Sequence, residues 1–339
     1  MRPAILSPLL ACLAVGTTIA ARQFPPVFRA ETEAVLVTAT VVNRDGRAVT
    51  DLRREELRVF EDGAPQEIAQ FHTDAEAPLS AVVVVDTSGS MVDKLEDVED
   101  ALRHFVDLLR PMDEVAMVRF NNVVEVVATA EEGRDRIGRH IGRLFASGGT
   151  ALYDAVIEGL EHARRGRHRK KALVVITDGN DTSSRRHEDD AIAAVRRSEV
   201  LVYALGIGHG ERGSFGHDLF GGRLGRQDEV DIRTLRRLAE PTGGRAYELE
   251  NAHRGGVDLI DKAVVEIAQE LRVQYTIGYY PTNTRKDGKF RRLAIETTRP
   301  GLTVRARSGY WAPCESSDTG ESGGRRGREQ SVCEDDTRD

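Results

Sequence analysis

The sequence predicts an α/β fold in which a doubly wound, mostly parallel sheet is inserted between two β-segments that form a small β-sandwich. Over residues 78–272, β-branched runs alternate with amphipathic helical patterns, which is typical of strands joined by crossover helices. Residues 30–77 and 273–312 alternate apolar and polar side chains, which is typical of antiparallel strands with one buried face. Neither flank has enough strands for a stable sandwich alone, so we expect the flanks to pair with each other.

The inserted region shows the periodicity of both strands and helices. Strands are expected near residues 81–85, 114–120, 123–129, 172–177, 199–206 and 245–249. Two helices show an apolar stripe, formed by Leu95, Val98, Leu102, Phe105 and Leu109 in the first and by Val257, Ile260, Val264, Ile267 and Leu271 in the second. The runs on either side of Asn121-Asn122 predict a hairpin, which adds an antiparallel edge strand to the parallel sheet.

Turn signals divide the two flanks into strands. In the first flank, Asp62-Gly63 separates runs 57–60 and 68–71, which predicts an antiparallel hairpin. The second flank gives strands 273–279, 291–297 and 302–306, with a turn at Asp287-Gly288 between the first two.

The two ends of the chain differ from the rest in composition. Residues 1–21 have a basic start, an apolar stretch and small residues before a cleavage point, which predicts a secretory signal peptide and an exported, periplasmic or extracellular protein. Lipoprotein processing at Cys12 is the alternative, and no other segment is apolar enough to span a membrane. Residues 313–339 are almost free of apolar side chains, which predicts a disordered tail. Within this tail, Cys314 and Cys333 either form a disulfide or remain two free thiols.

Three predicted loops carry oxygen-bearing side chains that fit a metal site. Asp86, Ser88 and Ser90 directly follow an apolar run, at the carboxyl end of a strand, where open α/β sheets place their sites. Thr150 ends a glycine-hinged loop before a helix, and Asp178 follows a second apolar strand. Oxygen ligands suit a hard divalent cation, so the pattern predicts Mg²⁺ or Mn²⁺ at this edge. The alternative is a serine-rich helix cap with two ordinary turns.

These residues resemble the von Willebrand factor type A domain. The metal-ion-dependent adhesion site of that family has a D-x-S-x-S motif followed by a distant Thr and a distant Asp. Those positions fall here on Asp86, Ser88, Ser90, Thr150 and Asp178. The resemblance implies a Rossmann-like sheet and an ion that binds an acidic side chain of a partner protein. A further likeness, to a secreted bacterial subfamily common in Acidobacteria, rests on residues 57–63, 271–281 and 305–310.

The residues also discriminate between classes of function. The chain has 48 basic and 55 acidic residues, and this mildly acidic balance gives no support for nucleic-acid binding. A Mg²⁺-dependent phosphohydrolase with Asp86 as nucleophile is one alternative, but Ser88 stands where such an enzyme needs a general acid. We therefore expect an exported binding or adhesion module without enzymatic activity. A structural envelope scaffold whose metal site is unused is the other alternative, and the oligomeric state is left open.

Overall fold

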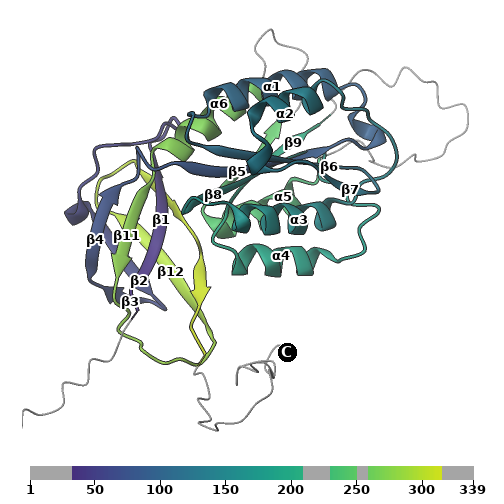
Figure 1. Cartoon of the computed structure of the whole chain (residues 1–339). Coiled ribbons are helices and arrows are strands. Elements are labelled where there is room, and N and C mark those ends of the chain that lie inside the picture. The colour runs from purple at the N-terminus through teal and green to yellow at the C-terminus, as the bar shows by residue number, and fades with distance from the viewer. Residues whose placement is uncertain (1–32, 209–229, 250–258, 315–339) are drawn as a thin grey trace, which may run out of the picture. The chain divides into compact units, whose positions relative to one another are not determined.

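The computed structural model of the chain describes residues 33–208, 230–249 and 259–314. These residues form the predicted α/β fold, with a central, mostly parallel sheet between helices and two further antiparallel sheets (Figure 1). The predicted signal peptide, Cys333 and nearly all of the predicted tail lie outside the described residues, as does Val257. None of the helices in the described ranges combines the length and apolar character needed to cross a bilayer.

The central sheet has the strand order β10-β9-β8-β5-β6-β7. Its strands are β5 (Leu79–Asp86), β6 (Glu114–Phe120), β7 (Val124–Ala128), β8 (Lys170–Thr177), β9 (Leu201–Ile207) and β10 (Arg245–Leu249). All neighbours pair in parallel except β6 and β7, which are antiparallel, so the predicted hairpin and edge strand are confirmed. The Asn121 side chain accepts a hydrogen bond from the amide of Val123 (2.9 Å), which closes the turn between them.

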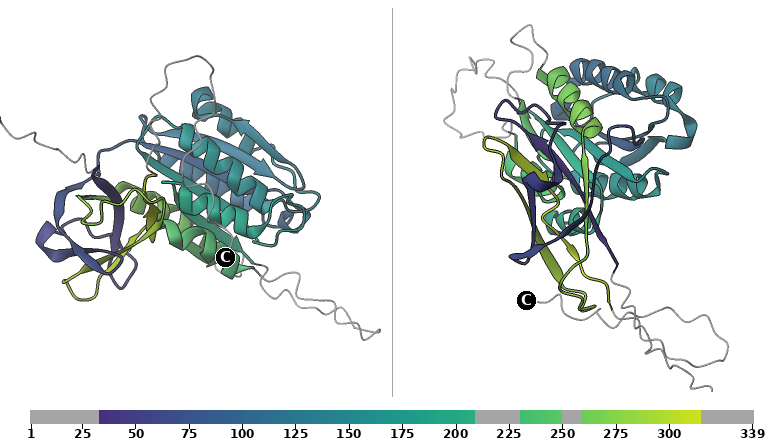
Figure 2. Two further views of the ribbon diagram at one scale, coloured as in Figure 1. Left: turned by 90° about the horizontal axis from the view of Figure 1, so that it is seen from below. Right: turned by 90° about the vertical axis from the view of Figure 1, so that its left-hand side faces the viewer.

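Helices cover both faces of this sheet. They are α1 (Leu95–Leu108), α2 (Arg134–Ile141), α3 (Leu152–Arg165), α4 (Glu188–Arg197), α5 (Ile232–Ala239) and α6 (Leu259–Arg272). Helices α1, α2 and α6 lie on one face, above the sheet in Figure 1, and α3, α4 and α5 lie on the other; the left view of Figure 2, from below, has this second layer in front. Successive residues of β5 enter opposite cores, with Val83 on the α1 side and Val84 on the α3 side. This two-sided burial explains why β5 appears in the sequence as an unbroken apolar run.

The two flanks combine into two four-stranded sheets. One sheet has the order β13-β1-β11-β4 and the other has the order β14-β12-β2-β3. The strands are β1 (Val35–Val42), β2 (Leu57–Glu61), β3 (Ala64–Gln66), β4 (Ile68–Thr73), β11 (Tyr275–Tyr279), β12 (Phe290–Thr297), β13 (Thr303–Ala306) and β14 (Gly309–Trp311). Strand β1 pairs with β11 and β13, and β12 pairs with β2, so each sheet contains strands from both flanks.

The predicted hairpin between runs 57–60 and 68–71 is wrong. Asp62 and Gly63 do form a tight turn, with φ of 48° and 81°, but the turn joins β2 to β3. Strand β4 then crosses to the other sheet and pairs with β11. Likewise, the strands on either side of Asp287-Gly288, β11 and β12, belong to different sheets. Alternating polarity identifies a half-buried strand without specifying which of two facing sheets it joins.

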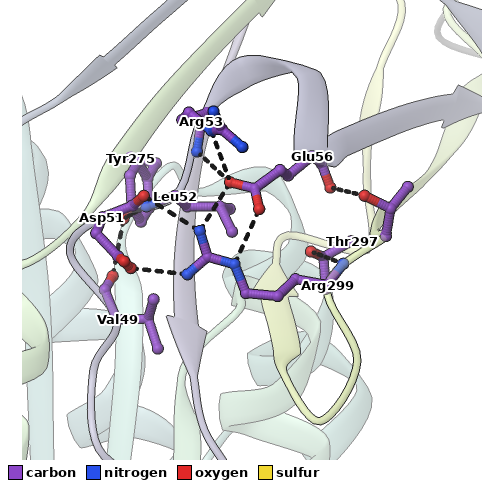
Figure 3. A network of polar contacts seen from close by, with 9 residues as sticks. Val49, Asp51, Leu52, Arg53, Glu56, Tyr275, Thr297 and Arg299 are labelled. Carbon is purple, nitrogen blue, oxygen red and sulfur yellow. Dashed lines mark hydrogen bonds and ion pairs between the residues drawn. The ribbon is translucent and has the colours of Figure 1, made fainter.

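Polar contacts also tie the two flanks together at one end of the sandwich (Figure 3). The Tyr275 hydroxyl donates to the carbonyl of Val49 (2.9 Å) and accepts from the amide of Leu52 (3.1 Å). Arg299 forms ion pairs with Glu56 (2.8 Å) and with Asp51 (2.8 Å). Hydrogen bonds from Arg299, and from the Arg53 amide, lower the pKa of Glu56 to about 2.

Candidate metal site

Asp86 ends β5 and lies at the bottom of the candidate site. Its side chain is fully buried. One carboxylate oxygen, Oδ1, accepts a hydrogen bond from the amide of Ser88 (2.8 Å). The other, Oδ2, accepts from the hydroxyl of Thr177 (2.6 Å), which ends the neighbouring strand β8. Two adjacent strand ends therefore fix the orientation of this carboxylate.

The chain turns immediately after Asp86 and brings two hydroxyls together. Gly89–Met91 form a single 3₁₀ turn, and the amide of Gly89 donates to the carbonyl of Gly148 (3.0 Å). The hydroxyl oxygens of Ser88 and Ser90 lie 3.1 Å apart. Neighbouring oxygens in an octahedron around Mg²⁺, at about 2.1 Å from the ion, are separated by about 3.0 Å. The spacing of the two serine oxygens thus fits two adjacent ligands of one ion.

The loop that carries Thr150 is held between two other loops. The amide of Ser147 donates to the carbonyl of Thr87 (2.8 Å), and the amide of Ala151 donates to the carbonyl of Asn121 (2.6 Å). On the other side, the Thr150 amide donates to the hydroxyl of Thr182 (2.9 Å), while its carbonyl accepts from the Thr182 amide (2.8 Å). Thr150 is consequently a buried residue in a loop with fixed ends.

Asp178 follows β8 and is also buried. Its Oδ1 accepts from the amide of Asn180 (3.3 Å), and its carbonyl accepts from the amide of Asp231 (3.2 Å). Gly179, between them, has a φ of 86°, a left-handed conformation that favours glycine. The chain therefore turns sharply away after Asp178.

The electrostatics of the site favour a cation. Burial raises the pKa of Asp86 to about 6, hydrogen bonds from Ser88 and Thr177 oppose this rise, and the nearby Asp178 carboxylate adds to it. In the described part of the chain, neither aspartate has an ion-pair partner. Two buried acidic groups close together repel each other, and a divalent cation between them would remove that repulsion.

The donor types restrict which ion would fit. The described residues contain no group of three or more His, Cys, Asp or Glu side chains placed to hold a metal. An ion at this edge would therefore depend on hydroxyl oxygens in addition to the carboxylates. Such an all-oxygen set fits Mg²⁺ or Mn²⁺ and is unsuited to zinc or copper.

The five residues proposed from the sequence thus come from three loops at the same edge of the sheet. Thr177, which orients Asp86, was missed by the sequence analysis. Its neighbour Asp178 was selected because a carboxylate after a strand is a recognisable ligand. A threonine that ends a strand carries no such signal, because threonine is a common strand residue.

Residues 81–260 match the von Willebrand factor type A domain, and the chain belongs to this family. An uncharacterized protein of Borreliella burgdorferi is 26% identical over 194 residues, which is 53% of this chain and 56% of the relative. An uncharacterized protein of Synechocystis sp. is 29% identical over 140 residues, which is 40% of this chain and 33% of the relative. The match thus spans about half the length of the first curated relative and about a third of the length of the second.

Two solved structures with a similar fold come from bacteria. A von Willebrand factor type A protein from Catenulispora acidiphila has a TM-score of 0.47 and 14% identity, covering 84% of this chain and 75% of its own. The conserved hypothetical protein BatB from Bacteroides thetaiotaomicron has a TM-score of 0.43 and 20% identity, covering 57% of this chain and 97% of its own.

Proposed function

We propose that the chain is an exported protein-binding module whose metal site engages an acidic side chain of a partner protein. The ion would be Mg²⁺ or Mn²⁺, held by Ser88 and Ser90 with Asp86, Thr150 and Asp178. Bound there, it would supply a Lewis-acidic position for an incoming carboxylate oxygen. The protein's own part is to hold five oxygen donors on three connected loops, so that the incoming group meets a fixed arrangement.

One observation carries this proposal: the carboxyl edge of the sheet gathers two buried carboxylates with three hydroxyls. The serine hydroxyls lie 3.1 Å apart, as adjacent ligands of one small ion would. Two carboxylates would neutralise a divalent cation, and an anionic ligand from outside would then complete its coordination. Membership of the von Willebrand factor type A family supports the same assignment.

The phosphohydrolase alternative is weaker on chemical grounds. A nucleophilic aspartate needs a free oxygen that is open to substrate. Asp86 is fully buried, so neither of its oxygens is open to a substrate. Ser88 has no acidic proton at neutral pH to give to a leaving group. We therefore expect no phosphatase activity, and turnover of a chromogenic phosphate that disappears in Asp86→Asn would reverse this expectation.

The metal assignment is tested by calorimetry with Mn²⁺. We expect one binding site in the wild type and no measurable binding in Asp86→Ala, because the central carboxylate is gone. Asp93→Ala is the matched control, since Asp93 is an exposed aspartate on the loop that follows the Gly89–Met91 turn. Equal Mn²⁺ binding by Asp86→Ala and the wild type would overturn the assignment.

A further inference from the structure

Three exposed apolar side chains lie on loops at the carboxyl edge of the sheet, the edge that carries the candidate metal site. Val92, Val123 and Phe145 are 61%, 63% and 75% exposed, and we call these three residues the apolar rim. Among the other large apolar side chains of the described residues, Met112 at 72% and Tyr280 at 53% are more than half exposed, and Met112 lies before β6 at the opposite edge of the sheet. Large apolar groups gathered around a polar site are a feature of surfaces that bind partners.

Val92 and Phe145 lie on the loops that carry Ser90 and Thr150, and Val123 lies on the β6–β7 turn, which is bonded to the Thr150 loop through the amide of Ala151 and the carbonyl of Asn121. Val92 directly follows the Gly89–Met91 turn, and its amide donates to the carbonyl of Gly89 (3.5 Å). Val123 follows Asn122, and a β-carbon on Gly148 would lie 2.5 Å from the Asn122 side-chain oxygen. The rim therefore approaches the candidate ligands from two different loops.

Phe145 comes from the third loop, and its neighbours show that its exposure is built into the fold. Leu144 and Ala146, on either side of it, pack against the hydrophobic core. Two residues further on, the amide of Ser147 is bonded to the carbonyl of Thr87. The loop is thus anchored before and after Phe145, while the phenyl ring itself is left in solvent.

Unpaired positive charge lies beside Phe145. Arg139 and Arg143 are exposed, and neither side chain has a hydrogen-bond or ion-pair partner within the described ranges. The pKa of the intervening His140 is lowered, by burial and then by the surrounding arginines, which include Arg143. Negative charge lies at this edge as well, since Asp93 and Glu96 are exposed next to Val92.

We propose that the apolar rim, together with Arg139 and Arg143, binds a peptide segment of a partner protein, and that this segment has a defined sequence pattern. In this segment, the acidic residue that reaches the metal is flanked by a bulky apolar residue, and a second acidic residue lies on the side that faces Arg143. This inference rests on the function proposed above and adds the chemical class of the partner. A single carboxylate on a metal would not distinguish one acidic surface from another, whereas the rim and the charge asymmetry would.

A membrane is the other surface that exposed apolar and basic groups attract. An anionic bilayer would meet Asp93 and Glu96 at the same time as Arg139 and Arg143, and the two acidic side chains would be repelled. A peptide of the proposed pattern avoids this repulsion, because its second acidic residue lies only on the basic side. The mixed charge of the edge thus favours a protein partner.

The experiment starts from a displayed library of random 12-residue peptides, selected on the full chain in Mg²⁺ and eluted with EDTA. The expected result is enrichment of peptides in which an acidic residue lies next to an aliphatic or aromatic residue, with a second acidic residue to one side. Enriched peptides that are acidic but show no apolar preference would overturn the inference, and so would the absence of any enrichment.

The strongest enriched peptide then serves as the probe for variants. Phe145→Ser is expected to weaken its binding about tenfold, because most of one aromatic contact is lost. Met112→Ser, an equally exposed control at the other edge, is expected to leave binding unchanged. Arg143→Glu is expected to weaken peptide binding, with the largest effect at low salt. Arg54→Glu, on the exposed 3₁₀ turn before β2, is the charge-matched control and is expected to leave peptide binding unchanged.

Mn²⁺ calorimetry on the same proteins separates this inference from the proposed function. Unchanged Mn²⁺ binding in Phe145→Ser with weaker peptide binding would support the apolar rim. A wild type that binds no Mn²⁺ would remove the proposed function, whereas Mn²⁺ binding with equal peptide affinity in Phe145→Ser would remove only this inference. Binding of the wild type to phosphatidylglycerol vesicles that Phe145→Ser loses would assign the rim to a membrane and overturn the peptide proposal.

Discussion

The two edges of the central sheet differ in whether their charged side chains form ion pairs. At the amino edge, Asp113 pairs with Arg272 of α6, and Arg169 pairs with Asp74 (3.2 Å) in the segment that leads from the sandwich to β5. At the carboxyl edge, the two aspartates of the candidate site have no ion-pair partner within the described ranges, and neither does Arg143. Paired charges stabilise the fold at the amino edge, whereas the two buried aspartates of the carboxyl edge would gain a compensating charge from a bound cation.

The amino edge also shows how the sandwich is attached. Arg169 donates to the Thr276 hydroxyl of β11 (2.7 Å), and the buried Lys170 donates to the carbonyl of Asp74 (3.1 Å). Arg305 of β13 forms an ion pair with the buried Glu270 of α6. All of these contacts join the α/β region to the flanks, so the polar groups of the amino edge stabilise the attachment of the sandwich. The carboxyl edge carries the candidate metal site.

The largest expected effect is at the amino edge, from Asp113→Ala. The side chain of Asp113 is fully buried, accepts from the amides of Leu79 (2.9 Å) and Arg110 (2.7 Å), and pairs with Arg272. Its removal leaves two amides and a guanidinium without their acceptor, so we expect a loss of about 3–5 kcal/mol in the free energy of unfolding. Urea denaturation measures this loss.

Asp100→Ala is the control for that measurement. Asp100 also pairs with an arginine, Arg103, but its side chain is 67% exposed, so its removal should change stability by less than about 0.5 kcal/mol. Similar losses in the two variants would contradict the view that burial, and not the count of ion pairs, makes the amino edge structural.

A second prediction concerns the carboxyl edge, where we expect metal binding to change more than stability. A β-carbon on Gly149 would lie 2.3 Å from the Ser183 hydroxyl and 3.0 Å from that of Thr182, which also accepts the Thr150 amide. Gly149→Ala should therefore shift the Thr150 loop, weaken Mn²⁺ binding about tenfold, and cost only about 1 kcal/mol of stability, because the loop is at the surface. Calorimetry and urea denaturation measure the two effects separately.

Gly138→Ala serves as the matched control for that loop. A β-carbon there would meet nothing within 4 Å, and Gly138 lies inside helix α2, where alanine is the better helix former. We expect unchanged Mn²⁺ binding and a gain of about 0.5–1 kcal/mol. Equal Mn²⁺ affinity in Gly149→Ala and Gly138→Ala would show that the Thr150 loop does not contribute to the site.

The parts of the molecule that were predictable from the sequence are those with local signals. The unbroken run before Asp86 marks a strand buried on both faces, and Asp62-Gly63 marks a tight turn wherever it occurs. The partner with which each strand pairs could not be predicted from local sequence. Strand β4 pairs with β11, more than two hundred residues later in the chain, and period-two patterning does not specify such a pairing.

In the candidate site, too, some features have a local sequence signal and others depend on contacts between distant segments. Its aspartates and serines were predictable because their order and spacing are unusual in loops. The positioning role of Thr177 depends on β8 lying beside β5, and the exposure of Phe145 depends on Leu144 and Ala146 reaching the core. In the sequence, Phe145 is simply an aromatic residue between two apolar neighbours, and such a residue is more often buried than exposed.

The smallest expected effect lies in the sandwich, away from both edges, and depends on pH. Hydrogen bonds from Arg299 and the Arg53 amide lower the pKa of Glu56 from 4.5 to about 2. A carboxylate whose pKa is lower in the folded state stabilises it above pH 4.5, and this contribution is lost as the pH falls from 4.5 toward 2. Glu56→Gln should therefore be less stable than the wild type at pH 7, and the difference should vanish near pH 2.

Glu55→Gln, which removes a neighbouring exposed glutamate without a hydrogen-bond partner among the described residues, should follow the wild type at every pH. A constant difference between Glu56→Gln and the wild type across this range would mean that the Glu56 charge does not stabilise the sandwich.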